Sequence, residues 1–125
     1  MIGGYAVGYH GYPRATGDMD VWVAIHEKNA AKLVDALREF GFDLPELEKS
    51  LFLTSGKIIR MGVPPIRLEI LTSIDGLEFE TCYRNRIVTD IGDIKVNFIS
   101  KGDLLINKRA SGRFKDLDDI EKLQE

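Results

Sequence analysis

Two aspartates separated by one residue, Asp18 and Asp20, are the side chains whose spacing in this sequence best suits joint chemistry. They open an apolar run that reaches Ile25 and alternates in hydrophobicity as a β-strand does. Side chains two residues apart in a strand point to the same face, with Cα atoms about 7 Å apart. Because Mg²⁺ prefers oxygen ligands, the pair predicts part of a divalent metal site. The alternative is a solvated strand start.

A pair of glycines, Gly3 and Gly4, precedes the two acids. Glycine lets a backbone approach a ligand closely, and backbone N–H groups at a helix start attract phosphate. Between the glycines and the acids lie Arg14 and Thr16, whose side chains suit contact with a phosphate or a carboxylate. This N-terminal stretch therefore predicts a metal-dependent nucleotide site. The alternatives are a helix start with tight packing and a surface ion pair of Arg14.

Three charged residues further along the chain add candidates to this site. Glu69 lies within an apolar run, where an isolated buried charge is costly, so it is a candidate third carboxylate. An ordinary ion pair with Arg67 or Arg60 is the alternative for this acid. Lys108 is a candidate for contact with a triphosphate, with Asp116 orienting it, and the competing interpretation is a solvated helix face.

The hydrophobic pattern predicts the elements that position these residues. It predicts helices over 3–12, 28–40, 45–50, 76–83, 101–110 and 115–123, and strands over 18–25, 57–63, 66–72, 86–90 and 93–99. The prolines at 64 and 65 remove two backbone donors, so we expect no regular tight hairpin there. Gly92 predicts a hairpin between the last two strands, and Ser100 followed by Asp103 resembles a capping box.

The composition is that of a single domain in a reducing compartment. The 125 residues, of which 44% are hydrophobic and 30% charged, suffice for one core. The formal net charge of −3 lacks the basic excess typical of general nucleic-acid binding. The single cysteine, Cys82, excludes an internal disulfide and is interpreted as a half-buried helix residue. With no membrane-spanning run and no signal peptide, we expect a cytoplasmic protein without a membrane partner.

Other residue types that often bind ligands receive structural interpretations. No second histidine or cysteine lies at ligand spacing from His10, which is therefore expected to be packed and hydrogen-bonded. The tyrosines Tyr5, Tyr9 and Tyr12 are expected to pack in the core or at an interface rather than to stack on a base.

The glycine pair, the Asp-x-Asp strand and the later Glu69 together resemble the DNA polymerase beta-like nucleotidyltransferase superfamily. Two longer segments, 9–16 and 107–119, are similar to a bacterial branch of small nucleotidyltransferases related to the abortive-infection toxin enzymes. That branch ends in a lysine on one helix and an Arg/Lys-Asp-x-x-Asp run on the next. The resemblance covers nearly the whole chain.

The resemblance implies a fold, an activity and a set of site residues. The fold would be the α/β (α+β) nucleotidyltransferase fold, a mixed and mostly antiparallel sheet flanked by helices, in one domain over residues 1–125. The activity would be transfer of a nucleoside monophosphate from an NTP, preferably ATP, to a hydroxyl of a tRNA, a protein or a small molecule. Two Mg²⁺ or Mn²⁺ ions would be held by Asp18, Asp20 and Glu69, the last also receiving a proton. Phosphates would be bound by Gly3, Gly4, Arg14, Thr16 and Lys108, with Asp116 supporting the lysine.

The N-terminus departs from that superfamily, in which a helix and an apolar strand precede the glycine pair. Here only Met1 and Ile2 precede it, so we interpret the helix and strand as missing. An exposed sheet edge would follow, and with it pairing with a second chain as a homodimer. The second hypothesis is therefore a catalytically silent nucleotide-binding module or one half of a toxin–antitoxin pair. A metal-dependent nuclease is disfavoured, because no Asp is followed by a Glu-x-Lys strand.

Overall fold

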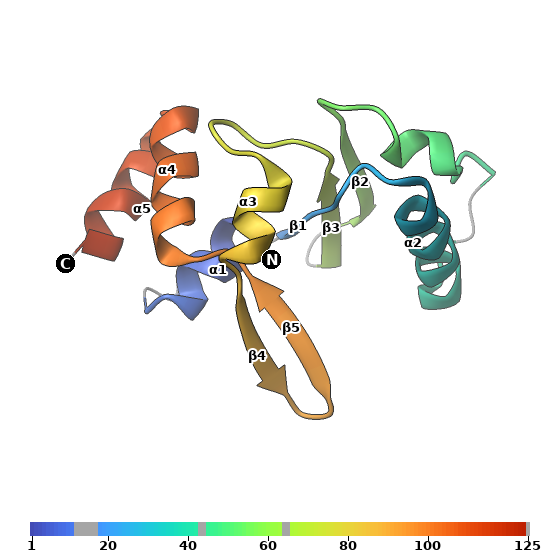
Figure 1. Ribbon diagram of the computed structural model, residues 1–125, viewed down its shortest axis with the longest axis horizontal. Coiled ribbons are helices and arrows are strands. Elements are labelled where there is room, and N and C mark those ends of the chain that lie inside the picture. The colour runs from blue at the N-terminus through green and yellow to red at the C-terminus, as the bar shows by residue number, and fades with distance from the viewer. Residues whose placement is uncertain (12–17, 43–44, 64–65, 125) are drawn as a thin grey trace.

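The structure, a computed structural model, describes residues 1–11, 18–42, 45–63 and 66–124. Its elements in chain order are α1 (Gly3–Tyr9), β1 (Asp18–Trp22), α2 (Glu27–Phe40), the 3-10 helix η1 (Lys49–Phe52), β2 (Ile58–Val63), β3 (Ile66–Leu71), α3 (Phe79–Arg84), β4 (Ile87–Ile91), β5 (Ile94–Phe98), α4 (Lys101–Ser111) and α5 (Phe114–Gln124). The expected mixed α+β class with a mostly antiparallel sheet arrangement is confirmed (Figure 1). Across the described residues, the helices are too short or too polar to cross a membrane.

A three-stranded sheet carries the acidic residues. Its strand order is β1-β3-β2, with β1 parallel and β2 antiparallel to the central β3. Val63 pairs directly with Ile66, so β2 and β3 form a hairpin across two residues, and the expectation of no tight hairpin there is wrong. The prolines themselves lie outside the described residues.

A second sheet consists of the antiparallel hairpin β4–β5, which projects from the body of the molecule (Figure 1). Ile91 pairs with Ile94 across its turn, as the sequence predicts. At the hairpin base the ring of Tyr9 stacks on Phe98, with centroids 4.3 Å apart. The Thr89 hydroxyl donates to the Tyr9 hydroxyl at 2.8 Å. Tyr9 thus packs against the hairpin, but it is 41% exposed and Tyr5 is 43% exposed, so a position in the core is wrong for both. Tyr12 lies outside the described residues.

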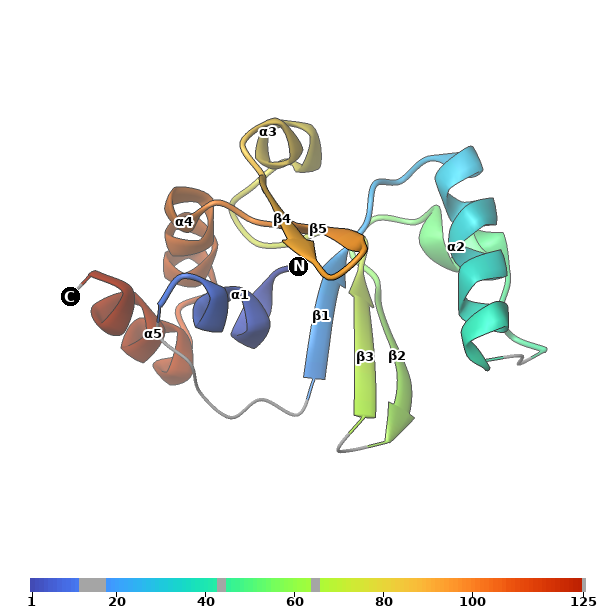
Figure 2. The same ribbon diagram turned by 90° about the horizontal axis from the view of Figure 1, so that it is seen from below.

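The three-stranded sheet is covered on both faces (Figure 2). On one face, Val21 and Ile70 belong to a cluster formed with α2 and η1, which we call the α2 core. On the other face, their neighbours Trp22 and Leu71 pack against a cluster that includes residues of α1, α4 and α5, which we call the α4 core. The alternation of side chains along a strand explains this division. Asp18 and Asp20 share the Trp22 face by the same alternation.

Glycines and caps set the ends of the helices. Gly41, at φ 122°, ends α2, and Gly112, at φ 66°, ends α4 in the left-handed conformation. The Ser100 hydroxyl accepts the Asp103 N–H at 3.2 Å, so the predicted cap is confirmed on the serine side. The first helix ends at Tyr9 rather than at residue 12, because Gly11 takes φ 109°.

Two other predicted helices begin later in the structure than the sequence pattern indicates. The helix expected over 45–50 is instead the 3-10 helix η1, whose Phe52 is fully buried in the α2 core. The helix expected from residue 76 begins only at Phe79, because Gly76 has a φ of 81°, outside the helical range. In both cases tertiary packing or backbone conformation outweighs the local pattern.

The two residues before the glycine pair lie between the two sheets. The Ile2 N–H donates to the Asp20 carbonyl at 3.0 Å, forming an antiparallel bridge on the outer edge of β1. The Ile99 N–H donates to the Met1 carbonyl at 3.1 Å, and the Met1 ammonium donates to the Asn97 carbonyl at 2.8 Å. The expected exposed sheet edge is therefore covered at Asp20, and this short segment links β1 to the end of β5.

Candidate functional site

A polar cavity of about 660 Å³ lies between the three-stranded sheet and helix α4. The predicted site residues among its lining are Gly3, Asp18, Asp20, Glu69 and Lys108. The fold thus brings together residues from the two ends of the chain and from its middle. Arg14 and Thr16 lie outside the described residues, and Gly4 lies within α1.

The strand register places the acids on neighbouring positions. Asp20 is the direct partner of Glu69 across the parallel β1–β3 pair, and Asp18 is the partner of Arg67. Gly3, at φ 66°, lies so close to this pair that a Cβ on it would overlap the Asp20 carboxylate. Tight packing, one of the two interpretations of the glycine, is therefore present. The phosphate-binding role of Gly3 and Gly4 stays a prediction.

Arginine side chains bind two of the three acids. Arg67 donates from Nε to Asp18 Oδ1 at 2.7 Å and from Nη2 to Asp18 Oδ2 at 2.8 Å, which is a bidentate pair. The same Nη2 lies 3.7 Å from Glu69 Oε1. Arg60 donates from Nε to that Glu69 oxygen at 2.7 Å. The ion pairing weighed for Glu69 from the sequence is thus present, and both arginines take part.

These contacts also set the charge state of Asp18. The hydrogen bonds from Arg67 hold the pKa of the Asp18 carboxyl below its usual value, against the opposing effect of partial burial. In turn, Asp18 raises the pKa of the Arg67 guanidinium. Both groups are charged at neutral pH, so the acidic end of the cavity is balanced by arginines.

The three acids suit a divalent metal in their chemistry and their strand positions. All are oxygen donors, two of them occupy directly paired positions, and the third lies two residues along on the same strand face. Yet within the described residues no three His, Cys, Asp or Glu side chains lie close enough to hold a metal ion as they stand. Arg67 and Arg60 occupy Asp18 and Glu69 instead. We therefore expect the donor set to fit Mg²⁺ only after Asp18 leaves Arg67.

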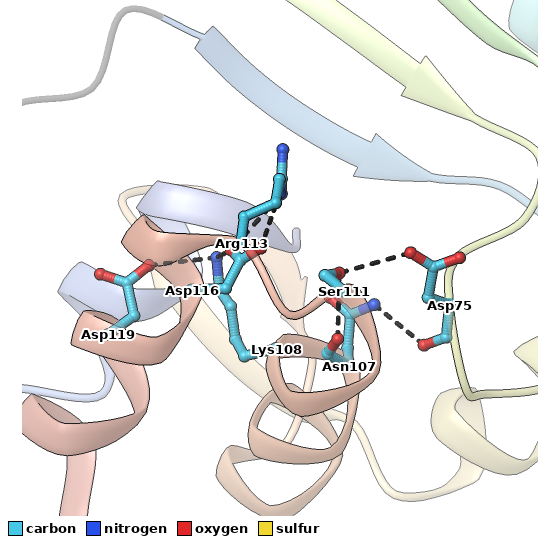
Figure 3. A network of polar contacts seen from close by, with 7 residues as sticks. All are labelled: Asp75, Asn107, Lys108, Ser111, Arg113, Asp116 and Asp119. Atoms are coloured by element: carbon cyan, nitrogen blue, oxygen red, sulfur yellow. Dashed lines mark hydrogen bonds and ion pairs between the residues drawn. The ribbon is translucent and has the colours of Figure 1, made fainter.

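The other side of the cavity is built on a buried lysine (Figure 3). Lys108 Nζ lies 3.0 Å from Asp116 Oδ1 and 3.1 Å from Asp119 Oδ2. The side chain of the lysine is 5% exposed, and those of the two aspartates are 0% and 2% exposed. The alternative of a solvated helix face is therefore wrong for Lys108 and Asp116. Burial at this level requires paired charges, since an uncompensated charge would be strongly destabilising.

Several polar residues of this region escaped the sequence interpretation. Arg113 Nε donates to Asp116 Oδ2 at 2.6 Å and closes the network over the aspartate. Asn107 Nδ2 donates to the Asp75 carbonyl at 3.0 Å, which ties α4 to the loop after β3. Asp119 was noted from the sequence only as the second aspartate of the Asp-x-x-Asp run, without a role, and its spacing of three residues from Asp116 places both on one helix face. For Asn107 and Arg113, the sequence carries no comparable signal.

Outside the cavity, His10 matches its sequence interpretation, whereas Cys82 lies on a helix as expected but is buried rather than half-buried. His10 Nε2–H donates to the Ile99 carbonyl at 2.8 Å, so this histidine is packed and hydrogen-bonded as expected. Cys82 is buried on α3, and burial, followed by the nearby charge of Asp103, raises the pKa of its thiol to about 11. A thiol with such a pKa is almost entirely protonated at neutral pH, which is the behaviour of a structural cysteine.

Comparison with known proteins adds no family to these observations. Neither a scan against protein-family models nor a search of curated proteins finds a match to this chain.

Proposed function

We propose that this protein is a Mg²⁺-dependent nucleotidyltransferase that moves a nucleoside monophosphate from an NTP, preferably ATP, to an acceptor hydroxyl. One observation carries the proposal: Asp18, Asp20, Glu69 and Lys108 line the same polar cavity. The three acids come from two adjacent strands, and the lysine comes from a helix near the other end of the chain. Acids that hold metal beside a fixed cation suit a substrate that carries several phosphates.

The cavity itself favours a polar ligand of nucleotide size. Its volume of about 660 Å³ lies within the range of roughly 300–1,000 Å³ typical of small-molecule sites. Charged side chains contribute to its walls from both the sheet and the helix. An apolar ligand would leave these groups without water or partners, which is costly.

Each residue has a distinct part in the proposed reaction. Asp18, Asp20 and Glu69 would hold Mg²⁺, which when bound stabilises the entering and leaving oxygens of a phosphoryl displacement. Lys108 would bind a phosphate oxygen as a fixed point charge, because Asp116 and Asp119 hold its ammonium group in place. Glu69 would accept the proton of the attacking hydroxyl if that hydroxyl lies within hydrogen-bond reach.

Transfer of labelled nucleotide tests this function. The protein is incubated with NTPs labelled in the α-phosphate, Mg²⁺ and a cell lysate, and labelled acceptors are separated by size and chemistry. We expect an acceptor to be labelled by the wild type, and Asp18→Asn with Asp20→Asn to reduce labelling about hundredfold or more, since metal-held charge stabilisation is lost. Asp90→Asn, an exposed aspartate on the projecting hairpin, is the matched control and should label as the wild type does. A wild type that labels no acceptor would overturn the proposal, as would a double variant that labels equally well.

The arginine contacts favour a second candidate, a nucleotide-binding module without catalysis. Arg67 and Arg60 donate hydrogen bonds to Asp18 and Glu69, so these two acids have a structural role available to them. Such a module would bind a nucleotide and act through another chain, for example as one half of a toxin–antitoxin pair. Calorimetry with ATP and Mg²⁺ separates the two candidates: binding without labelling of any acceptor supports the module.

A further inference from the structure

Within the part of the chain that the structure describes, Arg67 contacts two of the acids at the acidic end of the cavity. It donates to both oxygens of Asp18 at 2.7 and 2.8 Å, and its Nη2 is 3.7 Å from Glu69. These are two of the three acids that would hold Mg²⁺. Arg67 and a metal ion therefore compete at the same carboxylate, because two positive charges drawn to one carboxylate repel each other.

The exposure of Arg67 leaves it able to move. Its side chain is 34% exposed and lines the cavity, whereas the Lys108 side chain on the other wall is 5% exposed between two carboxylates. A partly exposed ion pair exchanges partners at small cost, while a buried one does not. Arg67, unlike Lys108, can thus leave its partner and stay within the cavity.

We propose that Arg67 is a nucleotide-binding residue with two alternative partners: Asp18 in the metal-free protein, and a phosphate of the bound nucleotide once Asp18 holds a metal ion. This inference rests on the proposed function and adds a residue to its site. A guanidinium binds phosphate with the same two-pronged geometry that it uses for carboxylate, so the exchange replaces one strong pair by another. The positive charge brought by the metal is then offset by the phosphates, and Arg67 keeps an anionic partner throughout.

The exchange makes metal binding and nucleotide binding depend on each other. A metal ion alone must separate Arg67 from Asp18 and leave the arginine without its partner, so it binds weakly. When a nucleotide is present, the arginine gains a phosphate and the metal binds more tightly. Linkage requires the converse, so metal must strengthen nucleotide binding by the same factor.

Binding measurements without catalysis test the exchange. The affinity of Mn²⁺ is measured by calorimetry, with and without an ATP analogue carrying a methylene group between the α- and β-phosphates. The proteins are the wild type, Arg67→Met, Arg67→Lys and Arg84→Met, the last removing an exposed arginine on α3 as a matched control. Without nucleotide, we expect Arg67→Met to bind Mn²⁺ about tenfold more tightly than the wild type and the control. With saturating Mn²⁺, the same variant should bind the analogue about tenfold more weakly.

Arg67→Lys is a second, more conservative variant, which keeps the test decisive if Arg67→Met fails to fold. A lysine keeps the charge but makes a single contact, so its Mn²⁺ and analogue affinities should lie between those of the wild type and Arg67→Met. A purely structural arginine would lower both affinities together, whereas the exchange raises one and lowers the other. Equal Mn²⁺ affinity in the wild type and both Arg67 variants would overturn the inference.

The outcomes separate this inference from the proposed activity. If the Arg67 variants bind Mn²⁺ more tightly and the nucleotide analogue more weakly, and the wild type labels no acceptor, the exchange is supported and the transferase activity is not. If the wild type labels an acceptor but the Arg67 variants bind Mn²⁺ no more tightly, the transferase stands and the exchange fails. Absence of Mn²⁺ binding in every protein would overturn both.

Discussion

At the scale of single residues, burial decides what a charged side chain does in this protein. Lys108 and Arg67 both line the cavity and both contact carboxylates, but the lysine is almost fully buried and the arginine is a third exposed. The lysine therefore has a fixed place, since removing it from its partners would leave buried charges. The arginine is held by partly exposed contacts with Asp18 and Glu69, which water and ions screen. The fixed cation suits positioning, and the exchangeable one suits a response to ligand.

Burial also predicts how the single thiol reacts. Because the pKa of the Cys82 thiol is raised to about 11, its thiolate fraction at neutral pH is very small. We expect a disulfide reagent to modify the native protein roughly a hundredfold more slowly than an unstructured thiol. The absorbance of the released thiolate measures the rate, and the same protein unfolded in urea, which should react at the ordinary rate, serves as the control. Modification of the native protein as fast as the unfolded one would contradict the burial of Cys82.

At the scale of elements, a single charge network joins the two C-terminal helices. Lys108 of α4 contacts Asp116 and Asp119 of α5, and Arg113 closes the same network from the start of α5 (Figure 3). For the Asp116 carboxyl, burial acts to raise the pKa, but the hydrogen bonds from Arg113 and Lys108 outweigh it and lower the pKa overall. The carboxylate form is therefore the one that stabilises the pairing of the helices.

The sign of this shift fixes the pH dependence of stability. A carboxyl whose pKa is lower in the folded protein than in the unfolded chain stabilises fully above the unfolded value, 3.8, and loses this contribution as pH falls through the folded value. At neutral pH, Asp116→Asn should lower the free energy of unfolding by about 3 kcal/mol, because the buried lysine loses part of its compensation. Urea unfolding should also show a smaller loss of stability on acidification for this variant than for the wild type.

An exposed aspartate of the same helix provides the matched control. Asp118→Asn removes a carboxylate that points to solvent, so stability should change by less than about 0.5 kcal/mol. The acid profile of this variant should follow that of the wild type. If both substitutions have the same small effect, the network does not hold α5 against α4.

The elements also show which parts of the fold can be predicted from local sequence patterns. Helix α2 was predicted within one residue, because its apolar stripe and Gly41 are local signals. The 3-10 helix η1 was not predicted, because it depends on the burial of the Phe52 ring in the α2 core, where residues distant in the sequence pack together. In the candidate site, Asp18 and Asp20 were chosen by their spacing and Glu69 by its place in an apolar run, but the bidentate contact of Arg67 with Asp18 was not predicted. It depends on the parallel register that sets Asp18 opposite Arg67, and periodicity within one strand carries no register between two.

At the scale of the whole molecule, one sheet separates two cores and supports the cavity. Val21 belongs with the α2 core and Trp22 with the α4 core, although they are neighbours in β1. The cavity lies on the α4 side, lined by Asp20 of β1 and Lys108 of α4. A change in either core therefore reaches β1, the strand that carries two of the three acids.

This shared sheet predicts that the two cores unfold together. Phe52→Ala in the α2 core and Leu104→Ala in the α4 core should each lower the free energy of unfolding by about 2–5 kcal/mol, because both side chains are fully buried. Phe40→Ala removes a ring that is 73% exposed and should change stability far less. Far-UV circular dichroism follows all elements, whereas the fluorescence of Trp22, the single tryptophan, follows the α4 side. In a cooperative molecule the two unfolding curves coincide in the wild type and in each variant. If Phe52→Ala shifts the dichroism curve and leaves the Trp22 transition in place, the cores are independent and the α2 side does not support the site.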